Sequence, residues 1–311
     1  MDAVVTLTPK TVAAPPAKAE GKSAGGEGTG GSTAAETTTD KDGNCFGNPK
    51  SVAKSNSLFY DMNHKKRGKA LIFNHENFDE STGMSGNALT RAGTNIDASD
   101  LEKVLNTRGF DVTIHKDLPN SEFITHYLEK AAKEKSNEES DCILVAVLTH
   151  GEDGLLYASK GKSYPEENLW LPFLADKCRG LAGKPKIFLI QACRGGEQDP
   201  GVEMDSPTEE VAKKDKKPTV KVPTHADTLV ARATVPGYVS WRNRGTGSYF
   251  IQALCDVLRD EAENEDPDDL VSLLVKAQGI VAEKTISDSW KQIPSFTCQL
   301  TKKVVLTKKD K

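Results

Sequence analysis

The stretch FLIQACRGGE, residues 188–197, places a cysteine directly after a run of apolar residues and directly before a pair of glycines. Such a run is typical of a buried strand, and the glycines mark its end. Cys193 has two interpretations. It is either a small buried hydrophobic residue, since free cysteine is among the most buried residue types, or a nucleophile at the rim of a sheet. The surrounding sequence decides between them.

Outward from this stretch, apolar strands alternate with amphipathic helices. CILVAVLTH (142–150) ends on His150 in the same way as KIFLIQAC (186–193) ends on Cys193. Continuous apolar strands that alternate with helices predict an α/β fold, doubly wound, with a mostly parallel sheet covered by helices on both faces. The helical patterns are IDASDLEKVLNTRGF (96–110), SEFITHYLEKAAKEK (121–135), SYFIQALCDVLRDEA (248–262) and DDLVSLLVKAQGIVAEK (268–284).

Three details of these elements are expected from local patterns. Asp97 is predicted to cap the first helix, because aspartate accepts hydrogen bonds from free N–H groups at a helix start. Phe123 is placed on the apolar face of the second helix. FTCQLTKKVVL (296–306) is predicted to be a long, apolar last strand that forms an exposed sheet edge.

The composition excludes several classes of partner. The 311 residues include 41 basic and 45 acidic ones, a net charge of −4, which favours neither nucleic acid nor an anionic membrane as a partner. The longest apolar run, CILVAVL, is too short to span a bilayer, and the N-terminus lacks the pattern of a signal peptide. Six cysteines without paired spacing predict reduced thiols and a cytoplasmic location. The sequence has no paired His/Cys spacing suited to zinc, so no bound metal is expected, and no cofactor is expected either.

Composition also divides the chain. Residues 1–57 are dominated by Ala, Gly, Thr, Ser, Lys and Pro, so this segment is predicted to be disordered because it cannot bury enough apolar surface to offset its entropy. A second polar stretch, from Gly195 to Lys221, is too long for an ordinary turn, and loops of this kind are either functional or disordered.

His150 and Cys193 are expected to meet, because the carboxyl ends of parallel strands lie at one edge of a sheet. A histidine can generate the thiolate that nucleophilic acyl transfer needs, and Gly151 and Gly195 leave the backbone N–H groups open to a developing oxyanion. Each residue taken alone is more often structural. The pair at one edge favours a catalytic site.

The sequence resembles the caspase family. QACRG (191–195) is similar to the caspase signature, and LTHGEDG (148–154) places His150 upstream of it at a comparable interval. The match extends from about residue 58 to 306 and is nearest to short-prodomain executioner enzymes of insects. It implies a six-stranded sheet whose edge strand pairs with its copy in a homodimer. The other matching stretches are GKALIFNHENF, TRAGTNID, LAGKPKIFLIQACRG, HADTLVARATVPGYVSWRN and KQIPSFTCQLTKK.

The resemblance implies a cysteine endopeptidase that cuts proteins after aspartate and executes apoptosis. Cys193 would be the nucleophile and His150 the general acid and base. The backbone N–H groups of Gly151 and Cys193 would form the oxyanion hole. The backbone carbonyl of Leu89 would orient the histidine.

A pocket for the substrate aspartate is implied at Arg91, Gln191, Ser240 and Arg242. Arginine suits this task because its fork binds a carboxylate through two hydrogen bonds. Without the motif, Arg91 would be assigned to the surface, since arginine is rarely buried without a partner. Further substrate contacts are implied at Val239, Trp241, Asn243 and Tyr249.

Some of these positions depart from the usual executioner pattern. Val239 and Tyr249 replace an aromatic ring and a tryptophan, and the loop before Lys291 is short. The pocket for the residue before aspartate is therefore expected to be more open and the outer pocket to be reduced. A preference for acidic sequences before the aspartate is still expected.

The resemblance also implies a zymogen that is cut after its own aspartates. Asp205, before Ser206, is the expected cut between subunits, and Asp42 is preferred over Asp40 in the N-terminal segment because Gly43 follows it. An upstream initiator caspase and inhibitor-of-apoptosis proteins are implied partners. The alternatives are a catalytically inactive scaffold or decoy, which would normally have lost one of these residues, and a non-peptidase cysteine hydrolase, which does not explain the paired arginines. The implied division is a prodomain (1–57), a large subunit (58–205), a linker (206–221) and a small subunit (222–311).

Overall fold

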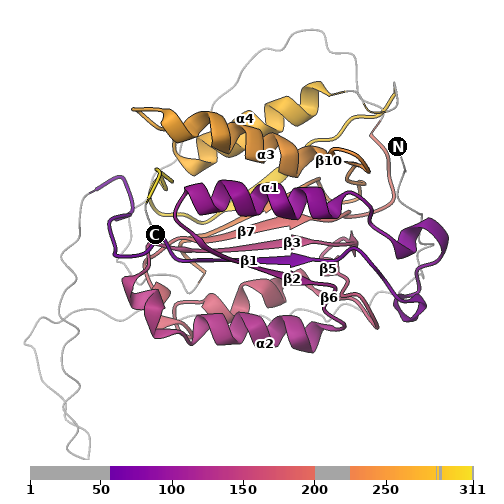
Figure 1. The fold of residues 1–311 in the computed structure, drawn as a ribbon, viewed down its shortest axis with the longest axis horizontal. Helices are drawn as coiled ribbons and strands as arrows, with labels where there is room; N and C mark the ends of the chain where they lie inside the picture. The colour runs from indigo at the N-terminus through magenta and orange to yellow at the C-terminus, as the bar shows by residue number, and fades with distance from the viewer. Residues whose placement is uncertain (1–56, 200–224, 285, 287–288, 310–311) are drawn as a thin grey trace, which may run out of the picture. The chain divides into compact units, whose positions relative to one another are not determined.

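A six-stranded sheet with strand order β11-β8-β7-β3-β1-β2 organises the chain (Figure 1). The computed structural model describes residues 57–199, 225–284, 286 and 289–309. Five strands are parallel, and β11 pairs antiparallel with β8. The α/β prediction with a mostly parallel sheet is confirmed. The strands are β1 (Lys69–Asn74), β2 (Asp111–Lys116), β3 (Ile143–Leu148), β7 (Lys186–Gln191), β8 (Thr228–Arg232) and β11 (Ser295–Cys298).

The inner strands are buried on both faces because their residues are apolar on both sides. In β1, Ala70 and Ile72 join one hydrophobic cluster, whereas Leu71 and Phe73 join the other. Successive side chains of a strand point to opposite faces, so a continuous apolar run supplies two cores. The first cluster is covered by α1, α3 and α4 and the second by α2, on opposite sides of the sheet (Figure 1). The helices are α1 (Thr94–Thr107), α2 (Ser121–Ala132), α3 (Tyr249–Asp260) and α4 (Leu270–Glu283).

Shorter elements connect the strands and helices of the main sheet, and some of them follow the carboxyl ends of the strands. A three-stranded sheet follows β3, and a two-stranded hairpin precedes α3. The short strands are β4 (Gly151–Glu152), β5 (Leu155–Leu156), β6 (Tyr164–Pro165), β9 (Arg242–Asn243) and β10 (Gly247–Ser248). The 3₁₀ helices are η1 (Glu80–Thr82), η2 (Gly86–Leu89), η3 (Lys135–Glu139), η4 (Glu166–Leu169), η5 (Leu171–Phe173), η6 (Arg179–Leu181) and η7 (Glu261–Glu263).

The prediction that Asp97 caps the first helix is wrong. Helix α1 begins at Thr94, and its N-cap is Gly93, with a φ of 92°. Asp97 is fully buried inside the helix, where its carboxylate accepts hydrogen bonds from Ser248 and Gln252. The local pattern could not show this, because the partners of Asp97 lie about 150 residues away in the chain.

Two other local expectations are also corrected. Phe123 is 48% exposed and not on the buried face of α2, which is formed by Ile124, Leu128 and Ala131. The last strand, β11, has only four residues. Gln299 still makes backbone hydrogen bonds to Thr228 and Asp227, and farther along the chain Val304 and Leu306 pack into the first hydrophobic cluster.

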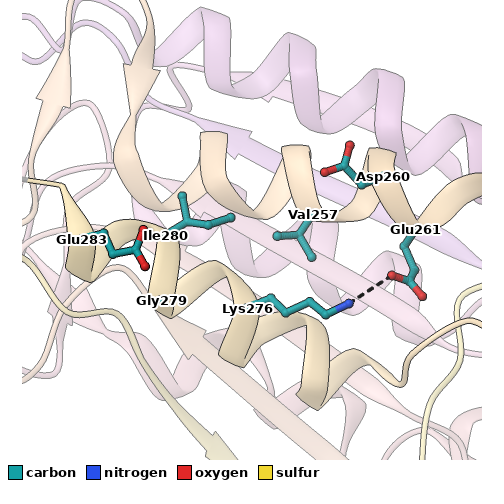
Figure 2. Close-up of a pocket in the computed structure, with 7 residues that line it drawn as sticks. All are labelled: Val257, Asp260, Glu261, Lys276, Gly279, Ile280 and Glu283. Atoms are coloured by element: carbon teal, nitrogen blue, oxygen red, sulfur yellow. Dashed lines mark hydrogen bonds and ion pairs between the residues drawn. The ribbon is translucent and has the colours of Figure 1, made fainter.

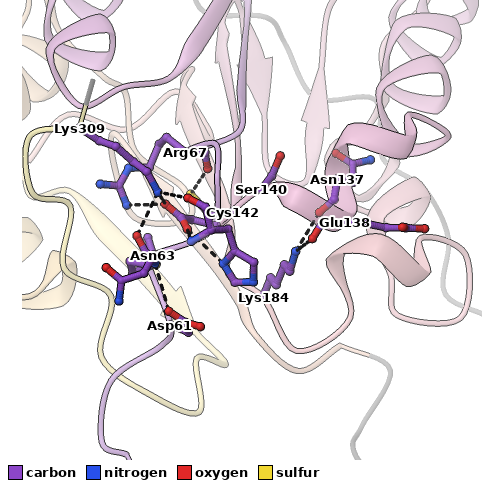
Figure 3. A network of polar contacts seen from close by, with 12 residues as sticks. Asp61, Asn63, Arg67, Asn137, Glu138, Ser140, Cys142, Lys184 and Lys309 are labelled. Atoms are coloured by element: carbon purple, nitrogen blue, oxygen red, sulfur yellow. Dashed lines mark hydrogen bonds and ion pairs between the residues drawn. The ribbon is translucent and has the colours of Figure 1, made fainter. Parts of the chain in front are cut away.

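The end of the described chain is tied to the start of β1 (Figure 3). The carboxylate of Asp141 is fully buried and accepts hydrogen bonds from Arg67 at 3.0 Å and from Lys309 at 2.7 Å. Arg67 also donates to the carbonyl of Thr307. A buried carboxylate needs such partners, because an unpaired charge is costly in the interior. These contacts lie at the amino end of β1.

Two further expectations concern thiols and membranes. The described cysteines, Cys142, Cys178, Cys193, Cys255 and Cys298, are all free thiols. No helix in the described ranges is both long enough and apolar enough to cross a membrane.

Candidate active site

The neighbouring strands β3 and β7 bring His150 and Cys193 to the same edge of the sheet. Leu148 pairs with Gln191, and the N–H of Thr149 donates to the carbonyl of Gln191 at 3.0 Å. Gly151 packs so closely that a Cβ atom added to it would lie 2.9 Å from the carbonyl oxygen of Cys193. The structure therefore places His150, Gly151 and Cys193 together, and glycine is needed at 151 for this approach.

A backbone carbonyl orients His150, but it belongs to Ala88 and not to Leu89. The Nε2 atom of His150 lies 3.0 Å from the Ala88 oxygen, in η2. A carbonyl oxygen can only accept, so Nε2 carries the hydrogen, and in the neutral ring Nδ1 keeps its lone pair. A backbone carbonyl was expected beside His150 and is present, but it comes from Ala88, one position before the expected Leu89.

His150 is held in its neutral form. The residue is 8% exposed, and burial together with the positive charges of Arg91 and Arg242 lowers its pKa from 6.5 to about 3. The contact with Ala88 acts in the opposite direction but is smaller. Near neutral pH the imidazole is therefore neutral, and its Nδ1 atom carries a free lone pair.

The Cys193 thiol is buried and contacts Ser240. Cys193 is 5% exposed, and its sulfur accepts a hydrogen bond from the N–H of Ser240 at 3.3 Å. The chain after it packs tightly, since Gly195 has a φ of 155° and a Cβ there would lie 2.1 Å from the oxygen of Gly237. Only glycine fits at 195. Cys193 therefore lies at the rim of the sheet and is also buried. Its burial does not conflict with a position suited to a nucleophile.

Two arginines lie beside this pair. Arg91 is 1% exposed, not at the surface, and donates to the carbonyl of His75 at 3.1 Å and to the hydroxyl of Thr94 at 2.9 Å. Arg242 donates from Nε to the carbonyl of Ala92 at 2.9 Å. Burial first, and then the charge of Arg242, lower the pKa of Arg91 well below its usual range. Two cations that repel each other at a buried site favour the binding of an anion.

Gln191 and Ser240 complete the group of predicted pocket residues. Gln191 is the last residue of β7, and its side-chain amide donates to the hydroxyl of Ser240 at 3.1 Å. Because Ser240 also contacts the sulfur of Cys193, the predicted pocket and the predicted nucleophile share a residue.

The other predicted substrate contacts have different environments. Val239 and Trp241 are buried in one hydrophobic cluster with Cys193. The side-chain oxygen of Asn243 accepts from the N–H groups of the next loop residues, and Lys284 lies over the ring of Tyr249 at 5.4 Å. Asp40, Asp42 and Asp205, the predicted cleavage sites, lie outside the described residues.

Two aromatic residues behind His150 were not predicted. The ring of Phe78 packs on that of His150 with centroids 4.8 Å apart, and the ring of His75 lies 6.2 Å from Phe78. His75 is fully buried, and its carbonyl holds Arg91. The sequence does indicate these two residues, because HENF (75–78) directly follows β1. Strand β1 runs parallel to β3, so its carboxyl end lies at the same edge of the sheet as His150.

A pocket of about 380 Å³ lies elsewhere, between α3 and α4 (Figure 2). It contains none of the predicted site residues, and its Lys276 is paired with Glu261 at 3.5 Å. Its lining residues are Val257, Asp260, Glu261, Lys276, Gly279, Ile280 and Glu283.

Comparisons with known proteins identify the family of this chain. A caspase-domain family matches residues 67–305. Caspase-1 of Spodoptera frugiperda is 46% identical over 261 residues, 82% of this chain and 83% of that protein. Caspase drICE of Drosophila melanogaster is 42% identical over 258 residues, 81% and 74% of the two chains. The crystal structure of the Spodoptera enzyme has a TM-score of 0.70 at 44% identity and covers 82% of this chain and 95% of that one. The chain therefore belongs to the caspase family and is a cysteine-type endopeptidase.

Proposed function

We propose that this caspase cuts proteins after aspartate, is made as a zymogen, and acts as an executioner in apoptosis. One observation carries the proposal: Arg91 and Arg242 repel each other beside Cys193 and His150, at a site where Arg91 is almost fully buried. An aspartate side chain of a substrate supplies the negative charge that this site favours. Gln191 and Ser240 would provide further polar contacts to it.

Catalysis would begin with a proton transfer. The neutral His150 takes the proton of the Cys193 thiol, and the sulfur attacks the scissile carbonyl carbon. The N–H groups of Gly151 and Cys193 bind the resulting oxyanion. The imidazolium then protonates the leaving amine, and a thioester remains on Cys193. Water, deprotonated by His150, hydrolyses the thioester and restores the thiol.

Substrate binding would also tune the base. The charges of Arg91 and Arg242 contribute to the low pKa of His150. A carboxylate bound between the arginines offsets their charge, so the pKa of His150 rises and the imidazole accepts the thiol proton more readily. Specificity for aspartate and the rate of the chemical step are therefore linked.

The subsites next to the aspartate pocket would set which residues the enzyme prefers directly before the substrate aspartate. Val239 has no ring to close the neighbouring pocket, and Trp241 lies beside it in the same hydrophobic cluster. Asn243 and Tyr249 would contact residues farther from the cut. We infer a preference for acidic tetrapeptides with a tolerant residue directly before aspartate.

Activation would divide the chain at Asp205. The large subunit (58–205) then carries His150 and Cys193, and the small subunit (222–311) carries Arg242. A cut after Asp42 removes the prodomain (1–57), and an upstream initiator caspase would make the first cut. Inhibitor-of-apoptosis proteins would restrain the mature enzyme. The family implies dimer formation, and we infer that the edge strand β11 pairs with its copy.

Cleavage of a tetrapeptide reporter that ends in aspartate tests the proposal. The wild-type chain should cleave it, whereas Cys193→Ala and His150→Ala should each lose nearly all turnover, because nucleophile and base act as a unit. Matched controls are Cys255→Ala, a buried thiol in α3, and His126→Ala, an exposed histidine in α2. Retention of more than a few per cent of turnover by both catalytic variants would overturn the mechanism. An inactive wild-type chain, fully processed, would favour the decoy alternative.

A further inference from the structure

We propose that Glu166 and Arg232 are positioning residues for the cleavage reaction, because their buried ion pair fixes the small sheet that begins at Gly151. The proposal rests on the proposed role of the Gly151 N–H in the oxyanion hole. It assigns a function to two residues that touch neither the substrate pocket nor the nucleophile.

The pair has the geometry of a strong, directional contact. Arg232 ends β8, and its Nη2 atom lies 2.7 Å from Glu166 Oε1, while its Nε atom lies 3.2 Å from each carboxylate oxygen. The two side chains are only 10% and 14% exposed. A bidentate pair that is shielded from water holds its partners in one orientation.

Glu166 connects this pair to the residues after His150. Its backbone N–H donates to the carbonyl of Gly154 at 3.0 Å, in the turn between β4 and β5. Strand β4 starts at Gly151, β5 pairs with both β4 and β6, and Glu166 directly follows β6. The N–H of Tyr157, after β5, donates to the carbonyl of His150 at 3.1 Å. The three-stranded sheet is thus fixed to β8 at one end and to the catalytic histidine at the other.

Arg232 also contacts the edge strand. Its Nη1 atom donates to the hydroxyl of Thr297, in β11, at 3.2 Å. Any shift of β11 relative to β8 therefore moves the cation that holds Glu166. The pair also spans the proposed cut at Asp205, since Glu166 precedes it and Arg232 follows it.

Loss of the Glu166–Arg232 pair is expected to change kcat and not KM. An oxyanion-hole N–H stabilises charge that exists only in the transition state, so its displacement lowers kcat and leaves KM nearly unchanged. The hydrogen bonds traced above lead to Gly151 and His150, and none of them involves Arg91 or Arg242. A purely structural role would instead reduce the fraction of folded enzyme without changing kcat per active site.

The test uses Glu166→Gln, Arg232→Met and the double variant in the full chain. With active sites counted by an irreversible aspartyl inhibitor, each single variant should lower kcat by about 10- to 100-fold, which is less than the roughly 100- to 1,000-fold loss when an oxyanion donor is removed altogether. KM should remain within about threefold of the wild type. The double variant should lose no more kcat than either single one, because the two residues act through each other. The control is Glu134→Gln, which breaks the Lys69–Glu134 pair at the amino end of β1 and should leave kcat unchanged.

A second measurement does not depend on activity. In the Cys193→Ala chain, amide hydrogen exchange over residues 151–157 should become faster when Glu166→Gln is added, and not when Glu134→Gln is added. Unchanged exchange in the folded Glu166→Gln chain overturns the proposal, even if the wild type proves inactive. Wild-type kcat in that variant overturns it too. Activity of the Cys193→Ala chain would contradict the proposed function instead.

Discussion

At the scale of single residues, the site is governed by positive charge in a buried place. Arg91 is held by a carbonyl and a hydroxyl, both of them neutral partners. Its charge lowers the pKa of His75 and of His150, and His75 is also the residue whose carbonyl holds it. This arrangement keeps both imidazoles neutral and favours an incoming carboxylate.

Replacement of an arginine in this group should abolish cleavage after aspartate. For Arg91→Ala and for Arg242→Ala, kcat/KM on an aspartate reporter should fall on the order of 100-fold or more, because a buried carboxylate would lack its partner. Steady-state kinetics measure this, with circular dichroism as a check of folding. Arg259→Ala, on the exposed side of α3, is the control and should keep full activity. An unchanged rate for a folded Arg242→Ala enzyme would refute the pocket assignment.

Acid should destabilise the fold through His75. Burial and Arg91 lower its pKa from 6.5 to about 4, so between these pH values the unfolded chain binds a proton that the folded chain does not. The free energy of unfolding should therefore fall as the pH drops from 6.5 to about 4.

Urea unfolding of the Cys193→Ala chain at several pH values in this window measures the effect. His75→Phe should make the pH dependence shallower, by at most about 1.4 kcal/mol per pH unit. Equal slopes with and without His75 would show that this residue does not titrate as described.

At the scale of elements, glycine decides how closely the loops can pack. Gly195 lies two residues after Cys193, beyond the end of β7, where a Cβ would overlap the backbone of Gly237. Gly151 meets the carbonyl of Cys193 in the same way. Gly279, by contrast, lies within α4 with nothing within 4 Å of a Cβ position. A side chain larger than hydrogen is therefore excluded at Gly151 and Gly195, whereas there is room for one at Gly279.

Alanine at these positions should have opposite effects on stability. Gly195→Ala should lower the free energy of unfolding by at least about 2 kcal/mol, because both φ and the space are unfavourable. Gly279→Ala should raise it by about 0.5–1 kcal/mol through helix propensity. Urea denaturation in the Cys193→Ala background measures both. A stabilised Gly195→Ala chain would show that the loop after Cys193 adapts more easily than the contacts indicate.

At the scale of the whole molecule, contacts join the segments on either side of the proposed cut. Strands β7 and β8 pair in parallel across it. Asp141 binds Lys309, and Asp97 binds Ser248, each across the same boundary. Because these contacts are buried or partly buried, the two segments are expected to stay associated after cleavage of the chain between them.

Self-processing should therefore occur without loss of the fold. Mass spectrometry of the expressed enzyme should find a fragment that starts at Ser206, and this fragment should be absent from Cys193→Ala. Asp205→Ala should remain uncut at this position and show low activity. Full activity of an uncut Asp205→Ala chain would overturn the zymogen scheme. The control is Asp199→Ala, since Asp199 is followed by Pro200 and should not be cut.

The sequence alone determined the fold class and the edge of the sheet at which the site lies. Apolar runs that end on His150 and Cys193 predict parallel buried strands, and the geometry of such sheets brings their carboxyl ends together. These inferences succeed because strand periodicity and strand ends are local properties. Arg91 was assigned to a pocket through its family motif, because no local pattern predicts a buried arginine.

Only the tertiary structure decided which distant groups meet. In the folded chain the ring of His150 contacts the carbonyl of Ala88, and the carboxylate of Asp97 contacts Ser248 at the start of α3. Strand β11 ends at Cys298. The fold also joins Glu166 to Arg232. A backbone carbonyl has no side-chain signature, and a buried charge is stabilised by partners that can lie anywhere in the chain. Such contacts depend on how the elements pack, which local sequence patterns do not contain.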